Sequence, residues 1–315
     1  MEIEILATES LGARSLCCLV TAQGQKVLID PGIALGYTRY GLLPHPLQVA
    51  VDERIRHKIV EAWSEATDIV ISHFHGDHTP LVHANPYQLS IAEVAGLNPR
   101  AKIWAKLSPL SPTETKRVED LSPFLHGCLL GAAEKGLGIL QFSKPVPHGT
   151  GDRVDTVVMT RIEDEYVFVH ASDIQLLNEQ AVSQILSWQP DIVLVSGPPL
   201  YLFKLSKDHI REAWRNAVKL SQEVDTLIID HHLLRSHAGV AWLEKLSSHT
   251  GRNIVCGADF AGRPRMLLEA RRRELYKKMP VPEGWHEAYA NGAVDTEHYW
   301  NLAKERYAHM GLSAL

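Results

Sequence analysis

Cysteine is scarce in this sequence, with four residues in a chain of 315. Cys17 and Cys18 are neighbours, whereas Cys128 and Cys256 stand alone, so the spacing is neither that of a C-x-x-C metal pair nor that of a disulfide framework. We expect buried thiols in a reducing compartment. Long apolar runs are also missing, and Met1–Leu6 has neither the basic region nor the apolar core of a signal peptide. These absences predict a cytoplasmic protein that does not associate with membranes.

An excess of positive charge is missing as well, because 32 lysines and arginines face 37 aspartates and glutamates, for a formal net charge of -5. The overall charge therefore gives no sign of a nucleic-acid-binding protein, and a polyanion would need a local basic patch. The sequence shows no internal repeat and no low-complexity linker. A chain of this length can bury about 75% of its unfolded surface in a single core. Since no feature of the sequence requires two domains, we predict one.

What the sequence does contain is a dense group of metal-ligand side chains. The group follows Asp68–Ser72, an apolar run that predicts a buried strand, and consists of His73, His75, Asp77 and His78. Imidazole and carboxylate ligands at this density suit zinc, or manganese or iron where oxygen ligands weigh more. Alternate residues of an extended chain share a side, so the first two histidines can converge on one ion. A turn at Gly76 directs the last two ligands to another, and the spacing therefore implies two neighbouring metals.

A His-x-His-x-Asp-His run behind a buried strand resembles the signature of the metallo-β-lactamase-fold hydrolases, and all four motif positions match. Nearly the whole chain is similar to an uncharacterised, mainly archaeal branch of that superfamily. The resemblance implies an α/β fold, a four-layer αββα sandwich with its metals in a cleft at one edge of two sheets. Within residues 1–315 as a single domain, we expect a partly helical insertion or cap in residues 81–145 and a helical C-terminal extension in residues 263–315.

The other landmarks of that family follow in chain order at predicted strand ends. Asp30 is expected to support the metal loop by hydrogen bonding, and His148 matches a third histidine of the first metal. Asp173 ends a strand and could bridge two cations. His231 and His232 follow the last such strand. Because neighbours in a strand face opposite sides, only one should point at the metals; we favour His231, which leaves His232 to contact the substrate or support a ligand.

The resemblance thus implies a complete ligand set for two divalent ions. The first ion is held by His73, His75 and His148, the second by Asp77, His78 and His231, and Asp173 bridges them. Two such ions, zinc in the first instance with manganese or iron as alternatives, lower the pKa of a shared water toward about 7 and stabilise charge on the attacked group. Asp77 could orient the resulting hydroxide, so Asp77 and Asp173 are the predicted catalytic residues.

The substrate does not follow from the fold. A histidine at position 75, where the oxygen-reducing di-iron relatives carry a glutamate, favours hydrolysis over redox chemistry. Residues 263–278 predict a strongly basic helix, by default a solvated face and alternatively a surface for phosphate or nucleic acid. We favour a phosphoester or nucleic-acid-related substrate over a lactone or other small cyclic ester. The alternative to an enzyme is a metal-stabilised binding protein without turnover. The sequence leaves open whether the chain forms a homo-oligomer.

A few further residues are candidates for contact with a substrate. Ser196 and Tyr201 belong to a stiff Ser-Gly-Pro-Pro-Leu-Tyr turn, and either could donate a hydrogen bond to an oxyanion, although the turn could equally be only a rigid loop. His83 could line the active-site pocket or lie idle on a helix. His45 belongs to residues 33–50, which predict a loop, and we expect it at the surface.

Overall fold

The first sheet opens with an antiparallel meander and continues in parallel. We describe residues 1–125, 129–150 and 155–306 of a computed structural model. The sheet has the order β1-β2-β3-β4-β5-β6 and consists of β1 (Glu2–Thr8), β2 (Leu16–Ala22), β3 (Gln25–Ile29), β4 (Asp68–Ile71), β5 (Lys102–Ala105) and β6 (Leu129–Gly131). The strands from β3 to β6 run parallel, so their carboxyl ends lie at one edge of the sheet.

The second sheet repeats this plan with an antiparallel half and a parallel half. Its order is β15-β14-β13-β12-β11-β8-β7, and it consists of β7 (Gly136–Leu137), β8 (Leu140–Phe142), β11 (Thr160–Glu163), β12 (Val167–His170), β13 (Ile192–Val195), β14 (Thr226–Ile229) and β15 (Ile254–Val255). The strands from β12 to β15 are parallel. A separate antiparallel pair joins β9 (Val146–Pro147) to β10 (Thr156–Val157).

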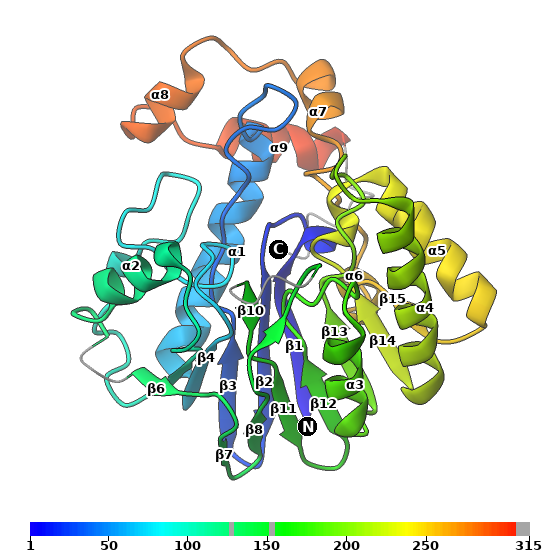
Figure 1. The fold of residues 1–315 in the computed structure, drawn as a ribbon. Coiled ribbons are helices and arrows are strands. Elements are labelled where there is room, and N and C mark those ends of the chain that lie inside the picture. The colour runs from blue at the N-terminus through cyan, green and yellow to red at the C-terminus, as the bar shows by residue number, and fades with distance from the viewer. Residues whose placement is uncertain (126–128, 151–154, 307–315) are drawn as a thin grey trace.

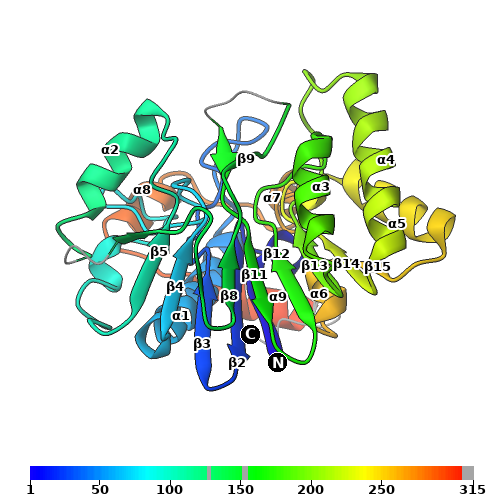
Figure 2. The ribbon, with the colours of Figure 1, turned by 60° about the horizontal axis from the view of Figure 1, so that its bottom comes forward.

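Helices cover the outer faces of both sheets. These helices are α1 (Pro46–Glu65), α3 (Glu179–Ser187), α4 (Lys207–Glu223) and α5 (His237–Thr250). The chain also forms α2 (Pro112–Leu121), α6 (Gly257–Phe260) and the single turns η1 (Glu9–Leu11), η2 (Ile91–Glu93) and η3 (Leu233–Arg235). Figures 1 and 2 show α1 beside the first sheet, α3, α4 and α5 beside the second, and the sheets between them. The predicted four-layer αββα sandwich is confirmed.

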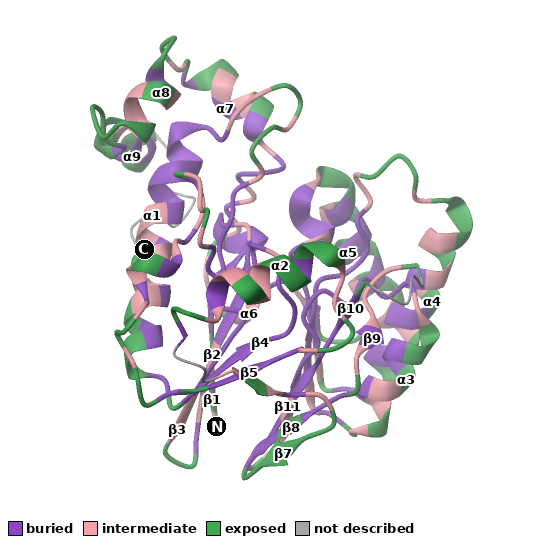
Figure 3. Ribbon diagram, turned by 60° about the vertical axis from the view of Figure 1, so that its left-hand side comes forward, coloured by how far each residue is buried: buried purple, intermediate pink, exposed green. Residues whose placement is uncertain are grey.

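The strands are apolar because both of their faces are covered. Along β4, Val70 belongs to the core between the sheets, whereas Ile69 and Ile71 belong to the core under α1. On the α1 side these residues share a core with Ile55 and Ile59, which are four residues apart and therefore on one helix face. Figure 3 shows the central strands as mainly buried ribbon. A continuous apolar run such as β4 is what a strand covered on both sides requires.

The start of α1 corrects the predicted loop over residues 33–50. The helix begins at Pro46, and His45 is its N-cap, with Nδ1 accepting a hydrogen bond from the Leu47 N–H at 3.1 Å. Proline suits this first position because it has no N–H to leave unsatisfied. The expectation of a surface histidine is wrong, since His45 is fully buried and its Nε2 lies 2.8 Å from the Met279 carbonyl oxygen.

The C-terminal part is helical, but its basic helix is shorter than predicted and one of its arginines is buried. It contains α7 (Arg272–Lys278), α8 (Trp285–Ala290) and α9 (Glu297–Arg306), and α9 lies near α1 (Figure 1). The predicted helix over residues 263–278 is wrong in extent, because only α7 forms. Arg272 is fully buried and pairs with Glu269 at 2.6 Å, so it belongs to the interior and not to a solvated face.

Three further predictions concern the cysteines, membrane-spanning helices and the division of the chain into parts. Cys17, Cys18 and Cys256 are free and buried, while Cys128 and Gly151 of the His148 segment lie outside the described residues. Within the described ranges, no helix is long and apolar enough to cross a membrane. The division of the chain into one domain with an insertion at 81–145 and an extension at 263–315 stays a prediction, and β5 and β6 of that insertion pair with the first sheet.

Candidate metal centre

The first group of ligand atoms forms where the segment after β4 meets the segment after β12. His73 Nε2 lies 3.0 Å from His75 Nδ1 and 3.5 Å from Asp173 Oδ2. The ring of His148 stands beside them, with its centroid 6.1 Å from that of His73 and 6.0 Å from that of His75. The predicted first set is therefore brought together, although His148 stands farther out than the other residues.

The second group shares Asp173 with the first. The other oxygen of Asp173, Oδ1, lies 3.3 Å from His78 Nε2 and 3.5 Å from His231 Nε2. His231 Nε2 is also 3.4 Å from Asp77 Oδ2. Asp173 thus offers one oxygen to each group, which is the arrangement expected of a carboxylate between two cations.

These residues fit a metal ion in both spacing and chemistry. Ligand atoms about 2.1 Å from a shared tetrahedral ion lie about 3.4 Å apart, close to the separations of the second group. His78 Nε2 and Asp173 Oδ1 are buried and have no hydrogen-bond partner among the described residues. Buried polar atoms without partners are costly unless something else satisfies them, and a divalent cation between a carboxylate and an imidazole does so.

The outward nitrogens of two histidines are held by hydrogen bonds. His78 Nδ1 lies 2.9 Å from Asp30 Oδ2, and His73 Nδ1 lies 2.9 Å from the Ser72 hydroxyl. The Asp30 carboxylate can only accept, so it keeps the proton of neutral His78 on Nδ1 and leaves the Nε2 lone pair for an ion. Burial alone would raise the pKa of Asp30, but the adjacent His78 outweighs it and the pKa is lowered. Asp30 therefore lies where the sequence predicted, as a support of the metal loop.

Both candidate histidines after β14 face the site, so the expectation that only one would do so is wrong. His231 has a φ of +43° and lies beyond the end of the strand, where alternation no longer applies. His232 Nε2 lies 3.2 Å from Asp173 Oδ2. Their surroundings still distinguish the two residues, as the contacts of Tyr201 indicate.

Tyr201 connects His232 to an arginine. Arg235 Nη1 donates to the Tyr201 hydroxyl at 3.2 Å, and that hydroxyl lies 3.1 Å from His232 Nδ1. Because arginine only donates, the tyrosine proton is free to go to Nδ1, which places the proton of neutral His232 on Nε2, facing Asp173. This leaves His232 as a donor and His231 as the better candidate ligand. Ser196, in contrast, is buried and donates to the Ile174 carbonyl oxygen at 3.1 Å.

Two arginines that the sequence analysis missed contact the ligand set. Arg14 Nε lies 3.0 Å from Asp77 Oδ2, and Arg235 Nη2 lies 3.2 Å from the same oxygen. Arg235 Nη2 is also 2.6 Å from His231 Nε2, and its Nε pairs with Glu9 at 2.7 Å. Only the position of Arg235, four residues after His231, could have drawn attention to it. Nothing in the local sequence around Arg14 indicates its role.

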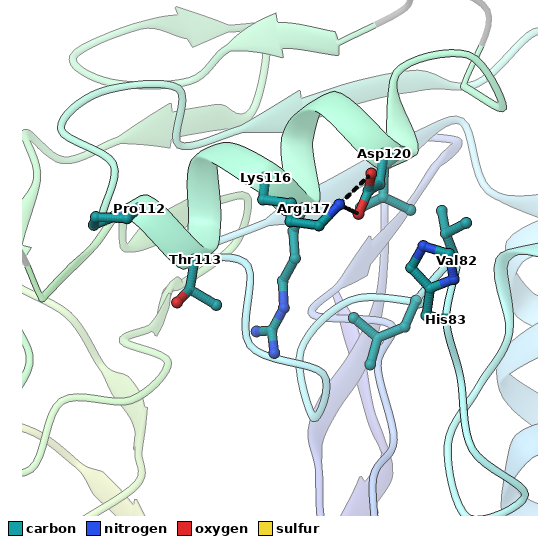
Figure 4. A pocket seen from close by; sticks show the side chains of 9 residues that line it. Val82, His83, Pro112, Thr113, Lys116, Arg117 and Asp120 are labelled. Carbon is teal, nitrogen blue, oxygen red and sulfur yellow. Dashed lines mark hydrogen bonds and ion pairs between the residues drawn. The ribbon is translucent and has the colours of Figure 1, made fainter.

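A cavity of about 440 Å³ lies next to the metal loop. Figure 4 shows it between α2, from which Thr113 and Arg117 point inward, and the segment that carries His83. Arg117 donates a hydrogen bond to the carbonyl oxygen of Phe74 and so ties α2 to the metal loop. The lining is mainly apolar and includes His83 but no predicted metal ligand, so a place for His83 in the active-site pocket stays a prediction.

Comparison with known proteins places the chain in a family. No family model matches it. It is 47% identical over 304 residues to a UPF0282 protein from Methanosarcina mazei, covering 95% of this chain and 99% of that relative. The chain belongs to the UPF0282 family. A further UPF0282 protein, from Thermococcus gammatolerans, is 35% identical over 300 residues, covering 88% of this chain and 96% of the relative. The predicted resemblance to a mainly archaeal branch is confirmed.

Among solved structures, this UPF0282 family member is similar to an isothiocyanate hydrolase from Delia radicum gut bacteria. The TM-score is 0.46 and the sequence identity 16%, covering 78% of this chain and 94% of that one.

Proposed function

We propose that this protein is a hydrolase that uses two divalent metal ions and acts on a phosphoester. The observation that carries the proposal is the pair of ligand groups that share Asp173, one oxygen to each. His73, His75, His148 and Asp173 would hold one ion, and Asp77, His78, His231 and Asp173 the other. Zinc suits this mixture of imidazole and carboxylate, with manganese and iron as alternatives. Ions held here would lower the pKa of a bound water toward about 7 and stabilise the charge that develops on the attacked group.

The chain's own residues supply positive charge and a proton beside these ligands. Arg14 is 31% exposed and extends the positive charge from Asp77 toward solvent, where an anionic substrate group would arrive. His232 carries its proton on Nε2, next to Asp173, and Tyr201 holds that tautomer. These features favour an anionic substrate, because guanidinium groups pair well with phosphate oxygens.

A small phosphoester fits better than a nucleic acid. The predicted basic helix is reduced to α7, where Arg271 and Lys278 both pair with Glu274, at 2.9 and 2.6 Å. Much of the charge that would attract a polyanion is thus balanced within the helix itself.

The second candidate function is hydrolysis of a lactone or other small cyclic ester. The cavity beside α2 favours it, since about 440 Å³ with a mainly apolar lining suits the carbon skeleton of a small ester. Widening the side chain of Thr113 to phenylalanine would fill the space that this residue faces in Figure 4. A raised KM for one substrate class in Thr113→Phe would identify the class that occupies the cavity.

Metal analysis and turnover, measured on the same preparations, test the proposed function. The substrates are bis(p-nitrophenyl) phosphate and a panel of lactones, and the proteins are the wild type, Asp173→Ala and His75→Ala. His57→Ala, which removes an exposed histidine of α1, is the control. We expect metal in the wild type and phosphodiester turnover that both site variants lose and the control keeps. Metal without any turnover that the variants abolish would contradict the hydrolase and leave a metal-stabilised binding protein.

A further inference from the structure

Arg235 lies among the ligands of the second ion. Its Nη2 is 2.6 Å from His231 Nε2 and 3.2 Å from Asp77 Oδ2, the two atoms that this chain offers to that ion besides His78 and Asp173. The same Nη2 is 3.3 Å from His231 Nδ1, so the guanidinium lies over the face of the imidazole ring near Nε2 and not in line with the Nε2 lone pair. Arginine stays protonated, so a cation bound at Nε2 would stand beside a permanent positive charge.

Asp77 is engaged in the same way. Its Oδ2 accepts hydrogen bonds from Arg14 and Arg235, so two guanidinium groups already compensate the charge that would attract a cation. A cation that uses this oxygen would stand beside both guanidinium groups, and their repulsion lowers its affinity.

The guanidinium of Arg235 is fixed in this position. The side chain is 3% exposed, its Nε pairs with buried Glu9 at 2.7 Å, and its Nη1 donates to Tyr201 at 3.2 Å. Moving it away from His231 would disturb a buried ion pair as well as the tyrosine contact. Arg235 is therefore part of the site and not a surface side chain that happens to reach it.

The first group of ligands has no such competitor. Among the described residues, no lysine or arginine makes a hydrogen bond or ion pair with His73, His75 or Asp173. At the second position, His78 Nε2 and Asp173 Oδ1 remain without hydrogen-bond partners, so an ion can still enter there. It does so against the positive charge of Arg235, which lies against both His231 and Asp77.

The geometry points to Arg235 as a built-in competitor for the second ion, which makes the two metal positions unequal in affinity. The inference rests on the proposed function for the existence of two positions, and it goes beyond it by assigning the difference between them to one residue. The first position fills at low metal concentration, and the second fills only at a higher one, because a cation there meets the charge of the guanidinium.

A titration of the metal-free full chain with Co²⁺, followed by its absorption and checked by elemental analysis, tests this inference. In the wild type we expect two binding phases whose Kd values differ by about tenfold or more. Arg235→Met should tighten the second phase toward the first. Arg14→Met, which removes a contact with Asp77 but none with His231, should have a smaller effect. Arg161→Met is the control, because Arg161 pairs with Glu163 at 2.7 Å and, among the described residues, makes no hydrogen bond or ion pair with Arg235 or a predicted ligand.

Two equal phases in the wild type that Arg235→Met leaves unchanged would overturn the inference. If Arg235→Met fails to fold because Glu9 is left unpaired, the double variant Glu9→Gln/Arg235→Met removes both charges and takes its place in the titration. Absence of turnover at every metal loading would contradict the hydrolase and leave the binding phases to decide the role of Arg235.

Discussion

Asp30 Oδ2 and His78 Nδ1 lie 2.9 Å apart, and both side chains are fully buried. The same carboxylate also accepts hydrogen bonds from the Ser72 N–H at 2.9 Å and the Ser172 hydroxyl at 2.6 Å. One side chain at the end of β3 thereby holds the segments after β4 and β12 together. Its effect on the metal centre is indirect, through the orientation of the His78 ring.

Replacing Asp30 by asparagine should weaken metal binding without removing a ligand. His78 loses its charged acceptor, and partners of this kind typically change metal affinity by about 10- to 100-fold. The measurement is metal retention during dialysis against a series of chelator concentrations. Asp68→Asn is the control, because Asp68 is a buried aspartate of the same region that accepts from Trp104 Nε1 at 2.9 Å and contacts no predicted ligand. Equal retention in the two variants would contradict the role of Asp30.

Adding a methyl group at Gly32 should displace the metal loop. A Cβ there would come within 2.1 Å of the Thr79 backbone nitrogen and 2.4 Å of the His78 carbonyl carbon, and backbone atoms cannot rotate away. We expect Gly32→Ala to lower the free energy of unfolding by about 1–3 kcal/mol or more and to release metal. Urea unfolding and elemental analysis measure the two effects. Gly131→Ala, whose nearest neighbour would be a Leu107 methyl carbon at 3.8 Å, should match the wild type in both measurements.

The buried pair of Lys106 and Glu114 should behave as a unit. Lys106 Nζ lies 2.7 Å from Glu114 and donates to the Thr156 carbonyl oxygen at 2.8 Å, so the pair ties α2 to the sheets next to the metal loop. Lys106→Met leaves a buried carboxylate unpaired, which typically costs about 3–5 kcal/mol of unfolding free energy. The double variant Lys106→Met/Glu114→Gln should recover much of that loss in chemical denaturation. A double variant as unstable as the single one would show that the pairing of charges is not the cause.

The buried His45 should make the protein less stable in mild acid. Burial lowers its pKa from 6.5 to about 4, with the Met279 carbonyl opposing the shift. Between pH 6.5 and 4 the unfolded chain binds a proton that the folded one does not, so stability is full above this window and falls as the pH falls through it, by about 3 kcal/mol in total. His45→Asn keeps a capping side chain and cannot titrate there. Its unfolding free energy should therefore vary less with pH than that of the wild type, and parallel curves would contradict the prediction.

The sequence by itself determined the sheets and most of the predicted ligands, because these are local patterns. Apolar runs such as Asp68–Ile71 predict strands covered on both sides, and ligand types placed just past the ends of such strands meet at one edge once the strands align. His73, His75, Asp77 and His78 were predicted from this alone, whereas Asp173 also needed the resemblance to the family. The prediction for the basic run at 263–278 failed because charge spacing alone does not show that Arg272 pairs with Glu269 in the interior.

Only the tertiary structure decided how distant segments complete the site. Arg14 and Arg235 meet on Asp77 from positions 63 and 158 residues away, and no periodicity encodes such a contact. The strand rule also failed at His231, because the chain turns with positive φ just after β14 and brings both histidines to the same side. The reason is physical: alternation holds only while the backbone is extended, and contacts between separate segments depend on how whole layers pack.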